Sequence, residues 1–155
     1  MPNFTRKYRI PDTTSRGTAV FNFSPLKYAP YAHACICKVT STANDKVSYA
    51  LFSYSTCVAY VSYTGKMVCY GTYSSQTRWH IAKFAQEITD IFGLDIPLVY
   101  QNFKNSIGGV YDINTGEMYE ATAMSFKDVV CSVLTQHYYA GNGKPYAYDL
   151  SKSNN

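Results

Sequence analysis

Residues 46–73, KVSYALFSYSTCVAYVSYTGKMVCYGTY, decide the fold of this chain. Short apolar and aromatic runs alternate along the stretch, with Val47, Tyr49 and Leu51 directed to one side of the first run. Thr64-Gly65 supplies a tight turn between the second and third runs, because glycine tolerates the positive φ of hairpin turns. At Ser53-Tyr54 we expect a bulge or bend. The stretch predicts a three-stranded antiparallel meander.

An amphipathic helix follows the meander and runs to about Phe92. Ser74 or Ser75 can cap its start, and Gly93 stands where a helix ends. Its apolar residues recur at helical spacing: Ile81, Phe84, Ala85, Ile88, Ile91 and Phe92. The pattern predicts a helix docked on the sheet.

The remaining patterns complete an α+β fold. We predict strands at 17–24 and 33–39, a hairpin at 109–122 and a second helix at 125–138, while 98–109 is ambiguous between strand and loop. The predicted architecture is a mostly antiparallel sheet of five to seven strands with two helices packed on one face.

The chain has room for a single domain. Its 155 residues divide into an irregular basic arm (1–16), one α+β domain (17–139) and a flexible tail (140–155) that has few apolar side chains. No apolar run approaches the roughly 20 residues of a membrane helix, and no secretory signal follows the N-terminus, so we expect a cytoplasmic protein with no membrane partner.

The five cysteines are predicted to be buried free thiols. Their number is odd, and no CxxC or HxxxH pair is present, so neither a disulfide set nor a zinc site is expected. No nucleotide-binding or hydrolase signature occurs, and we expect no metal and no cofactor. Sixteen tyrosines favour both strand faces and binding surfaces.

Positive charge is concentrated in the first 44 residues, where Asp12 is the sole acid. Aromatic residues are interleaved with this charge, a mixture typical of surfaces that bind phosphates and stack bases. The alternative is that the rings point into the core and the cations are ordinary solvated charges. The basic residues are Arg6, Lys7, Arg9, Arg16, Lys27 and Lys38.

The start of the predicted helix, SSQTRWHI at 74–81, is a candidate anion site. Its first amides lack helical partners, and Arg78 and Trp79 stand beside them. The candidate site for nucleic acid or phosphate therefore combines these two residues with the basic cluster: Arg6, Lys7, Arg9, Arg16, Lys27, Arg78 and Trp79.

A thiol enzyme is a separate possibility. Cys57 could serve as nucleophile if His80 lay beside it as base, although no third group that orients the imidazole is evident. The alternative role for His80 is structural, through a hydrogen bond to Tyr or Ser of the adjacent hairpin.

Residues 51–88 resemble a group of small proteins encoded by bacteriophages and mobile elements of gut-type bacteria. The shared pattern is a Ser-Tyr-x-Thr-x-Val-Ala strand followed by a Ser-rich helix start with a His-Ile pair. The positions that carry it are Ser53, Tyr54, Thr56, Val58, Ala59, Tyr73, Ser74, Ser75, Thr77, His80 and Ile81. The resemblance implies a phage or mobile-element product acting inside a bacterial cell, with Tyr54, Thr56 and His80 meeting as a polar cluster.

From these features we predict a non-enzymatic binding protein that engages nucleic acid or a host nucleoprotein. Inhibition of a host defence, as by an anti-CRISPR protein, is one specific form of this hypothesis. The alternatives are a virion or oligomeric assembly protein with a tyrosine-rich surface, and the thiol enzyme that uses Cys57 and His80.

Overall fold

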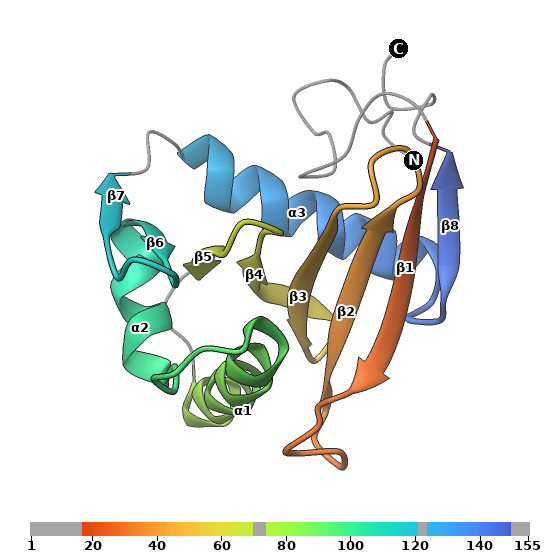
Figure 1. Ribbon diagram of the computed structural model, residues 1–155. Helices are drawn as coiled ribbons and strands as arrows, with labels where there is room; N and C mark the ends of the chain where they lie inside the picture. Colours follow the sequence, from red (N-terminus) through yellow and green to blue (C-terminus); the bar gives the residue numbers. More distant parts are fainter. Residues whose placement is uncertain (1–16, 70–73, 121–123, 150–155) are drawn as a thin grey trace.

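The chain folds around one antiparallel sheet that has helices against both faces (Figure 1). The computed structural model describes residues 17–69, 74–120 and 124–149. The strands are β1 (Thr18–Pro25), β2 (Ala34–Ser41), β3 (Val47–Ser53), β4 (Thr56–Val61), β5 (Lys66–Cys69), β6 (Gly109–Asp112), β7 (Met118–Glu120) and β8 (Tyr146–Asp149). The helices are α1 (Ser75–Phe92), α2 (Tyr100–Asn105), the 3-10 turn η2 (Ser106–Gly108) and α3 (Met124–Ala140).

The strand order is β7-β6-β5-β4-β3-β2-β1-β8, and every neighbouring pair is antiparallel. Seven strands follow one another across the sheet in chain order, and the last strand returns to the free edge of β1. This confirms the predicted α+β class and the antiparallel sheet. The part of the chain that the structure describes has eight strands, one more than the upper limit of the prediction.

The predicted meander is β3-β4-β5, and its two turns differ in chemistry. Gly65 adopts φ 86° in the second turn, as expected. The first turn has only two central residues, Tyr54 and Ser55, with φ of 52° and 77°. A register shift at Leu51/Phe52 marks a bulge within the strand pair, so the expected irregularity lies beside the turn.

The helix α1 begins and ends as its sequence predicts. The Ser74 side chain accepts a hydrogen bond from the amide of Thr77, and Gly93 adopts the left-handed conformation with φ 60°. Ile81, Phe84 and Ile88 are buried against the sheet, where each buried side chain of this size stabilises the fold by about 1.5–3 kcal/mol.

The helices cover both faces of the sheet, so the predicted packing on one face is wrong. One apolar cluster joins α1 and α2 to the sheet, and a second cluster on the other face includes Cys131, Val133 and Leu134 of α3. In Figure 1, α1 lies in front of the sheet and α3 crosses behind it. In β2, Ile36 belongs to one cluster and Cys37 to the other. Both faces of this strand are therefore apolar, and each is shielded from water by packing against other elements.

Two further predictions need correction. The ambiguous segment 98–109 is mainly helical, because it contains α2 and η2. The predicted flexible tail contains β8, which pairs with β1 along four residues from Thr18↔Asp149 to Phe21↔Tyr146. The ordered domain therefore extends to Asp149, while the predicted arm at 1–16 lies outside the described residues.

Candidate nucleic-acid interface

Much of the predicted basic and aromatic face is absent from the described surface. Arg6, Lys7, Arg9 and Arg16 lie outside the described residues. Phe21 is buried in the core, and Phe23 packs against the same cluster. The alternative interpretation of these two rings is therefore correct, because they contribute to folding and cannot stack on a ligand.

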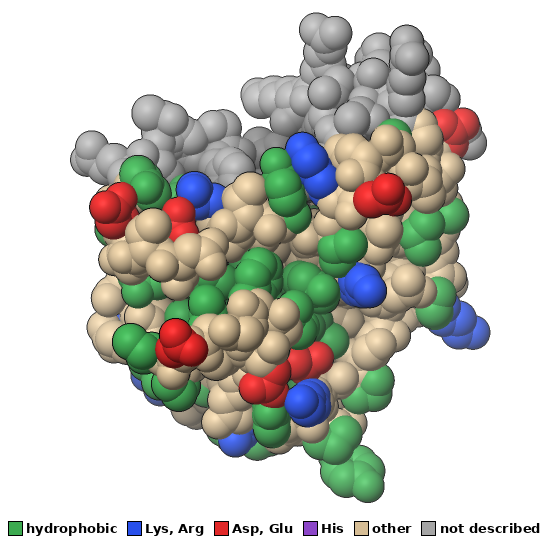
Figure 2. Space-filling model, viewed as in Figure 1, with side chains coloured by type: hydrophobic (Ala, Val, Ile, Leu, Met, Phe, Trp, Pro, Cys, Tyr) green, Lys and Arg blue, Asp and Glu red, His purple; other side chains and the backbone are tan. Residues whose placement is uncertain are grey.

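Lys27 is exposed but already paired. Its ammonium lies 3.0 Å from Oδ2 of Asp90, and its backbone amide donates to Oε1 of Glu87 at 2.8 Å. The Tyr28 hydroxyl also donates to Asp90, and together the hydrogen bonds from Tyr28 and Lys27 lower the pKa of that carboxyl. Among the described residues on this face, Figure 2 shows basic side chains scattered between acidic ones and no continuous basic patch.

Arg78 and Trp79 lie together on the first turns of α1. Both side chains are exposed, and Nζ of Lys83 lies 5.9 Å from the centre of the Trp79 ring. No Asp or Glu occurs in the sequence between Asp45 and Glu87. The first half of α1 therefore offers two cations and an aromatic face, and the nearest acid of this helix, Glu87, lies one turn beyond Lys83.

His80 forms the centre of a buried polar cluster. Its Nδ1 lies 2.8 Å from Oγ of Ser53, which in turn lies 3.0 Å from Oγ1 of Thr77. Burial lowers the pKa of His80, and a nearby His33 lowers it further, so the imidazole is neutral at pH 7. The predicted structural role of His80 agrees with this arrangement, in which a serine of the adjacent hairpin is the partner.

An aromatic row connects this cluster to the surface. The rings of His33 and Tyr54 are stacked with centres 5.7 Å apart and an interplanar angle of 20°. Tyr54 lies 5.5 Å from His80, and His80 lies 5.8 Å from Trp79. We call these four residues the ring row. Three of its members are exposed to solvent: His33, Tyr54 with an exposed fraction of 55%, and Trp79 with an exposed fraction of 43%.

The predicted polar cluster is only partly assembled. Tyr54 and His80 are adjacent, whereas Thr56 is exposed and lines a separate hollow with Cys57, Thr135 and Tyr139. Ser53 and Thr77 occupy the position that Thr56 was expected to fill. The sequence contained one usable signal for them, since both belong to the motif of residues 51–88.

The structure separates the two residues of the thiol-enzyme hypothesis. Cys57 belongs to the cluster on the α3 face, and its amide donates to Oγ1 of Thr135 at 3.0 Å. His80 belongs to α1 on the opposite face. Burial also raises the pKa of the Cys57 thiol well above its usual range, which disfavours the thiolate needed for attack.

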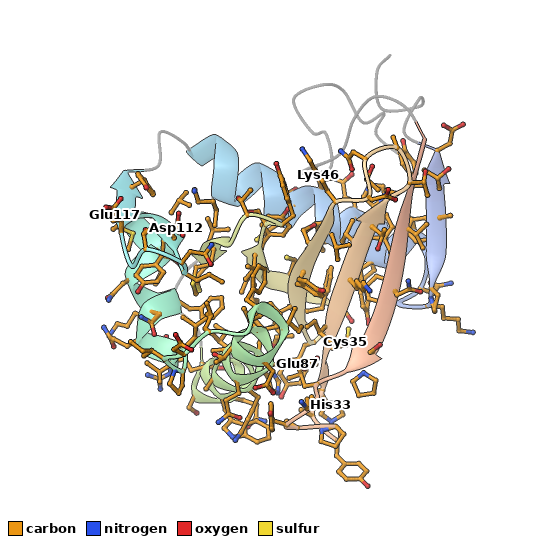
Figure 3. The ribbon with its side chains drawn as sticks, in the orientation of Figure 1. His33, Cys35, Lys46, Glu87, Asp112 and Glu117 are labelled. Atoms are coloured by element: carbon orange, nitrogen blue, oxygen red, sulfur yellow. The ribbon has the colours of Figure 1, made fainter. Side chains whose placement is uncertain are left out.

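A pocket of about 380 Å³ opens beside the ring row. It lies between the start of β2, the β3–β4 turn and the last turns of α3, and Tyr54 belongs both to its wall and to the ring row. Figure 3 shows His33 and Cys35, two of its lining residues, at the start of β2. Sequence reasoning missed this pocket because its walls come from three distant segments.

The described part of the chain contains neither a metal-binding cluster nor a membrane-spanning helix. Within residues 17–69, 74–120 and 124–149, no group of three His, Cys, Asp or Glu side chains is placed to hold a metal ion. Over the same ranges, no helix has the length and apolar character needed to span a membrane.

Comparisons of the chain with protein-family models, with curated proteins and with solved structures found no match. The resemblance of residues 51–88 to phage and mobile-element proteins therefore stays a prediction.

Proposed function

We propose that this protein is a non-enzymatic binding protein that engages single-stranded nucleic acid through the ring row and the adjacent cations. The observation that carries the proposal is the continuous series of ring contacts from His33 through Tyr54 and His80 to Trp79. Exposed aromatic faces bind successive bases with little sequence preference, and stacking contributes about 1–3 kcal/mol per base.

The charges near the ring row suit a phosphate backbone. Arg78 and Lys83 lie on the same helix as Trp79. The nearest acid along the sequence is Glu87, and its carboxylate already accepts a hydrogen bond from the backbone amide of Lys27. Tyr31, in the β1–β2 connection two residues before His33, is 98% exposed and adds a further aromatic side chain to the surface. With so few cations, binding is expected to be weak and to fall as salt rises.

Trp79 is the only tryptophan and supplies a direct test. Oligothymidylate of about 15 nucleotides, a length in the range of known single-strand sites, should quench its fluorescence at low salt, and added salt should restore the emission. Unchanged emission and no shift of a labelled strand at low salt would overturn the proposal.

Matched variants locate the surface. Tyr54→Ala should weaken binding about 5-fold to 150-fold because one stacking face is lost, whereas Tyr139→Ala removes a ring of similar exposure from α3 and should have little effect. Arg78→Ala should reduce the salt dependence, and Lys104→Ala on α2 is its control. Equal effects of each variant and its control would show that the ring row is not the site.

The same surface also suits a host nucleoprotein, which is the partner implied by the resemblance to phage and mobile-element products. Capture from bacterial lysate, with and without nuclease, distinguishes the two partners. A protein retained after nuclease treatment and lost with Tyr54→Ala supports the nucleoprotein. Loss of all bound material on nuclease treatment supports nucleic acid alone.

A further inference from the structure

The pocket beside the ring row has aromatic walls. Phe52 and Tyr138 form one side, where their rings are stacked with centres 4.9 Å apart and an interplanar angle of 26°. His33 and Tyr54 form another part of the wall and stack on each other. Such walls favour a flat, conjugated ligand, because ring faces and edges pack against another ring system in defined geometries.

The pocket has no permanently charged side chain in its lining. None of its lining residues is Lys, Arg, Asp or Glu. Burial raises the pKa of the Cys35 thiol to about 11, so this side chain is uncharged at pH 7. The Ser55 hydroxyl lies 3.5 Å from the hydroxyl of Tyr138, a long contact that leaves both groups able to bond a ligand. The pocket therefore suits an uncharged ligand that has hydrogen-bonding edges, and it does not suit a phosphate.

The volume sets a limit on ligand size. Pockets that bury small molecules measure about 300–1,000 Å³, and this pocket of about 380 Å³ lies near the lower end of that range. One or two fused rings fit such a space, whereas a run of nucleotides does not. The ring row offers a path to the pocket, because Tyr54 belongs to both.

We infer that this pocket receives a single nucleobase, turned out of a strand that lies along the ring row. The inference rests on the proposed function and adds a base-specific site to a surface that stacks bases without selectivity. Proteins that bind an extruded base hold it between aromatic side chains and contact its edge with hydrogen bonds, and Ser55 and Tyr138 supply those groups here.

Protection of Cys35 tests the pocket directly. The thiol lines the pocket and is partly exposed, so alkylation of native protein reports its accessibility. The four ribonucleosides and thymidine, each added singly at millimolar concentration, are the probes. We expect at least one to slow Cys35 alkylation fivefold or more, while ribose and inorganic phosphate leave the rate unchanged. An alkylation rate that none of the five nucleosides lowers would overturn the inference.

Variants separate the pocket from the strand-binding surface. Ser55→Ala removes one hydrogen-bonding group and should weaken nucleoside protection about threefold or more, whereas Ser24→Ala, which removes an exposed hydroxyl from β1, should not. If strands still quench Trp79 in an Arg78-dependent way but no nucleoside protects Cys35, the pocket inference is wrong and the proposed function stands. If neither effect occurs, both are wrong.

Discussion

The hydroxyl of Ser53 lies 2.8 Å from Nδ1 of His80 and joins the last residue of β3 to the first turns of α1. Both groups are buried, and the same hydroxyl contacts Thr77. This bond sets the orientation of the imidazole, whose ring lies between those of Tyr54 and Trp79. A polar contact inside the fold thus holds the exposed rings in their relative positions.

Ser53→Ala should therefore destabilise the fold and disturb the ring row. It leaves a buried imidazole nitrogen without its partner, which costs about 1–3 kcal/mol in the free energy of unfolding. Urea denaturation measures the loss, and Ser24→Ala is the matched control at an exposed strand position. A loss no greater than that of the control would contradict the structural role of this bond.

His137 should make the protein acid-sensitive. It is fully buried, bonds the Tyr146 hydroxyl through Nδ1, and burial lowers its pKa to about 4. The unfolded chain binds a proton near pH 6.5 and the folded protein does not, so this contribution to stability is complete above pH 6.5 and is lost as pH falls toward 4. The slope is about 1.4 kcal/mol per pH unit, or about 3 kcal/mol in all.

Denaturation of His137→Phe at several pH values between 4 and 7 checks this sign. The variant keeps an aromatic ring next to Phe21, which stacks on the native imidazole at 4.8 Å. It should be less stable at pH 7 because Tyr146 loses its partner, yet its stability should depend less on pH. If the free energy of unfolding depends on pH in the same way in the variant and in the unsubstituted protein, His137 is not the titrating group.

Ser55→Gly should stabilise the β3–β4 turn. Ser55 has φ 77°, a left-handed conformation that costs a residue with a side chain roughly 1 kcal/mol and costs glycine nothing. Gly65→Ala is the opposite test, because its φ is 86° and an added Cβ would lie 2.6 Å from Nδ2 of Asn114. Thermal melting should rise for the first variant and fall for the second. A lower melting temperature for Ser55→Gly would mean that the serine hydroxyl contributes more than the turn strain costs.

The cysteines should differ in reactivity. Cys35 is partly exposed, whereas Cys37, Cys57, Cys69 and Cys131 are buried. We expect alkylation of native protein at pH 9 to label Cys35 about tenfold or more faster than Cys57, as followed by peptide mass spectrometry. Preferential labelling of Cys57 would instead revive the thiol-enzyme hypothesis.

Local patterns predicted the elements with strong periodicity and distinctive ends. The meander at 46–73 and the helix α1 are correct because each turn or cap uses residues whose backbone chemistry is specific, such as Gly65 and Gly93. The helix α2 was missed because it has only six residues, too few to show a helical period. The strand β8 was missed because its burial alternates weakly and depends on Phe21 and His137, which lie elsewhere in the sequence.

The candidate site also combines residues that local patterns reveal with residues that only the fold brings together. Arg78 and Trp79 were identifiable from the helix start, whereas His33 was not, because it joins the ring row only when the start of β2 lies beside the β3–β4 turn. Thr56 was placed in the wrong cluster because the bulge in β4 and the two-residue turn decide which face each side chain occupies.

By itself the sequence determined the α+β class, the antiparallel meander and the limits of α1, because these depend on side-chain period and on backbone chemistry within a few residues. The tertiary structure alone decided that α1 and α3 lie on opposite faces and that Cys57 is remote from His80. It also decided that rings from the β1–β2 connection, the β3–β4 turn and α1 form one row. Those relationships join residues tens of positions apart, and only packing of the two apolar faces of the sheet brings them together.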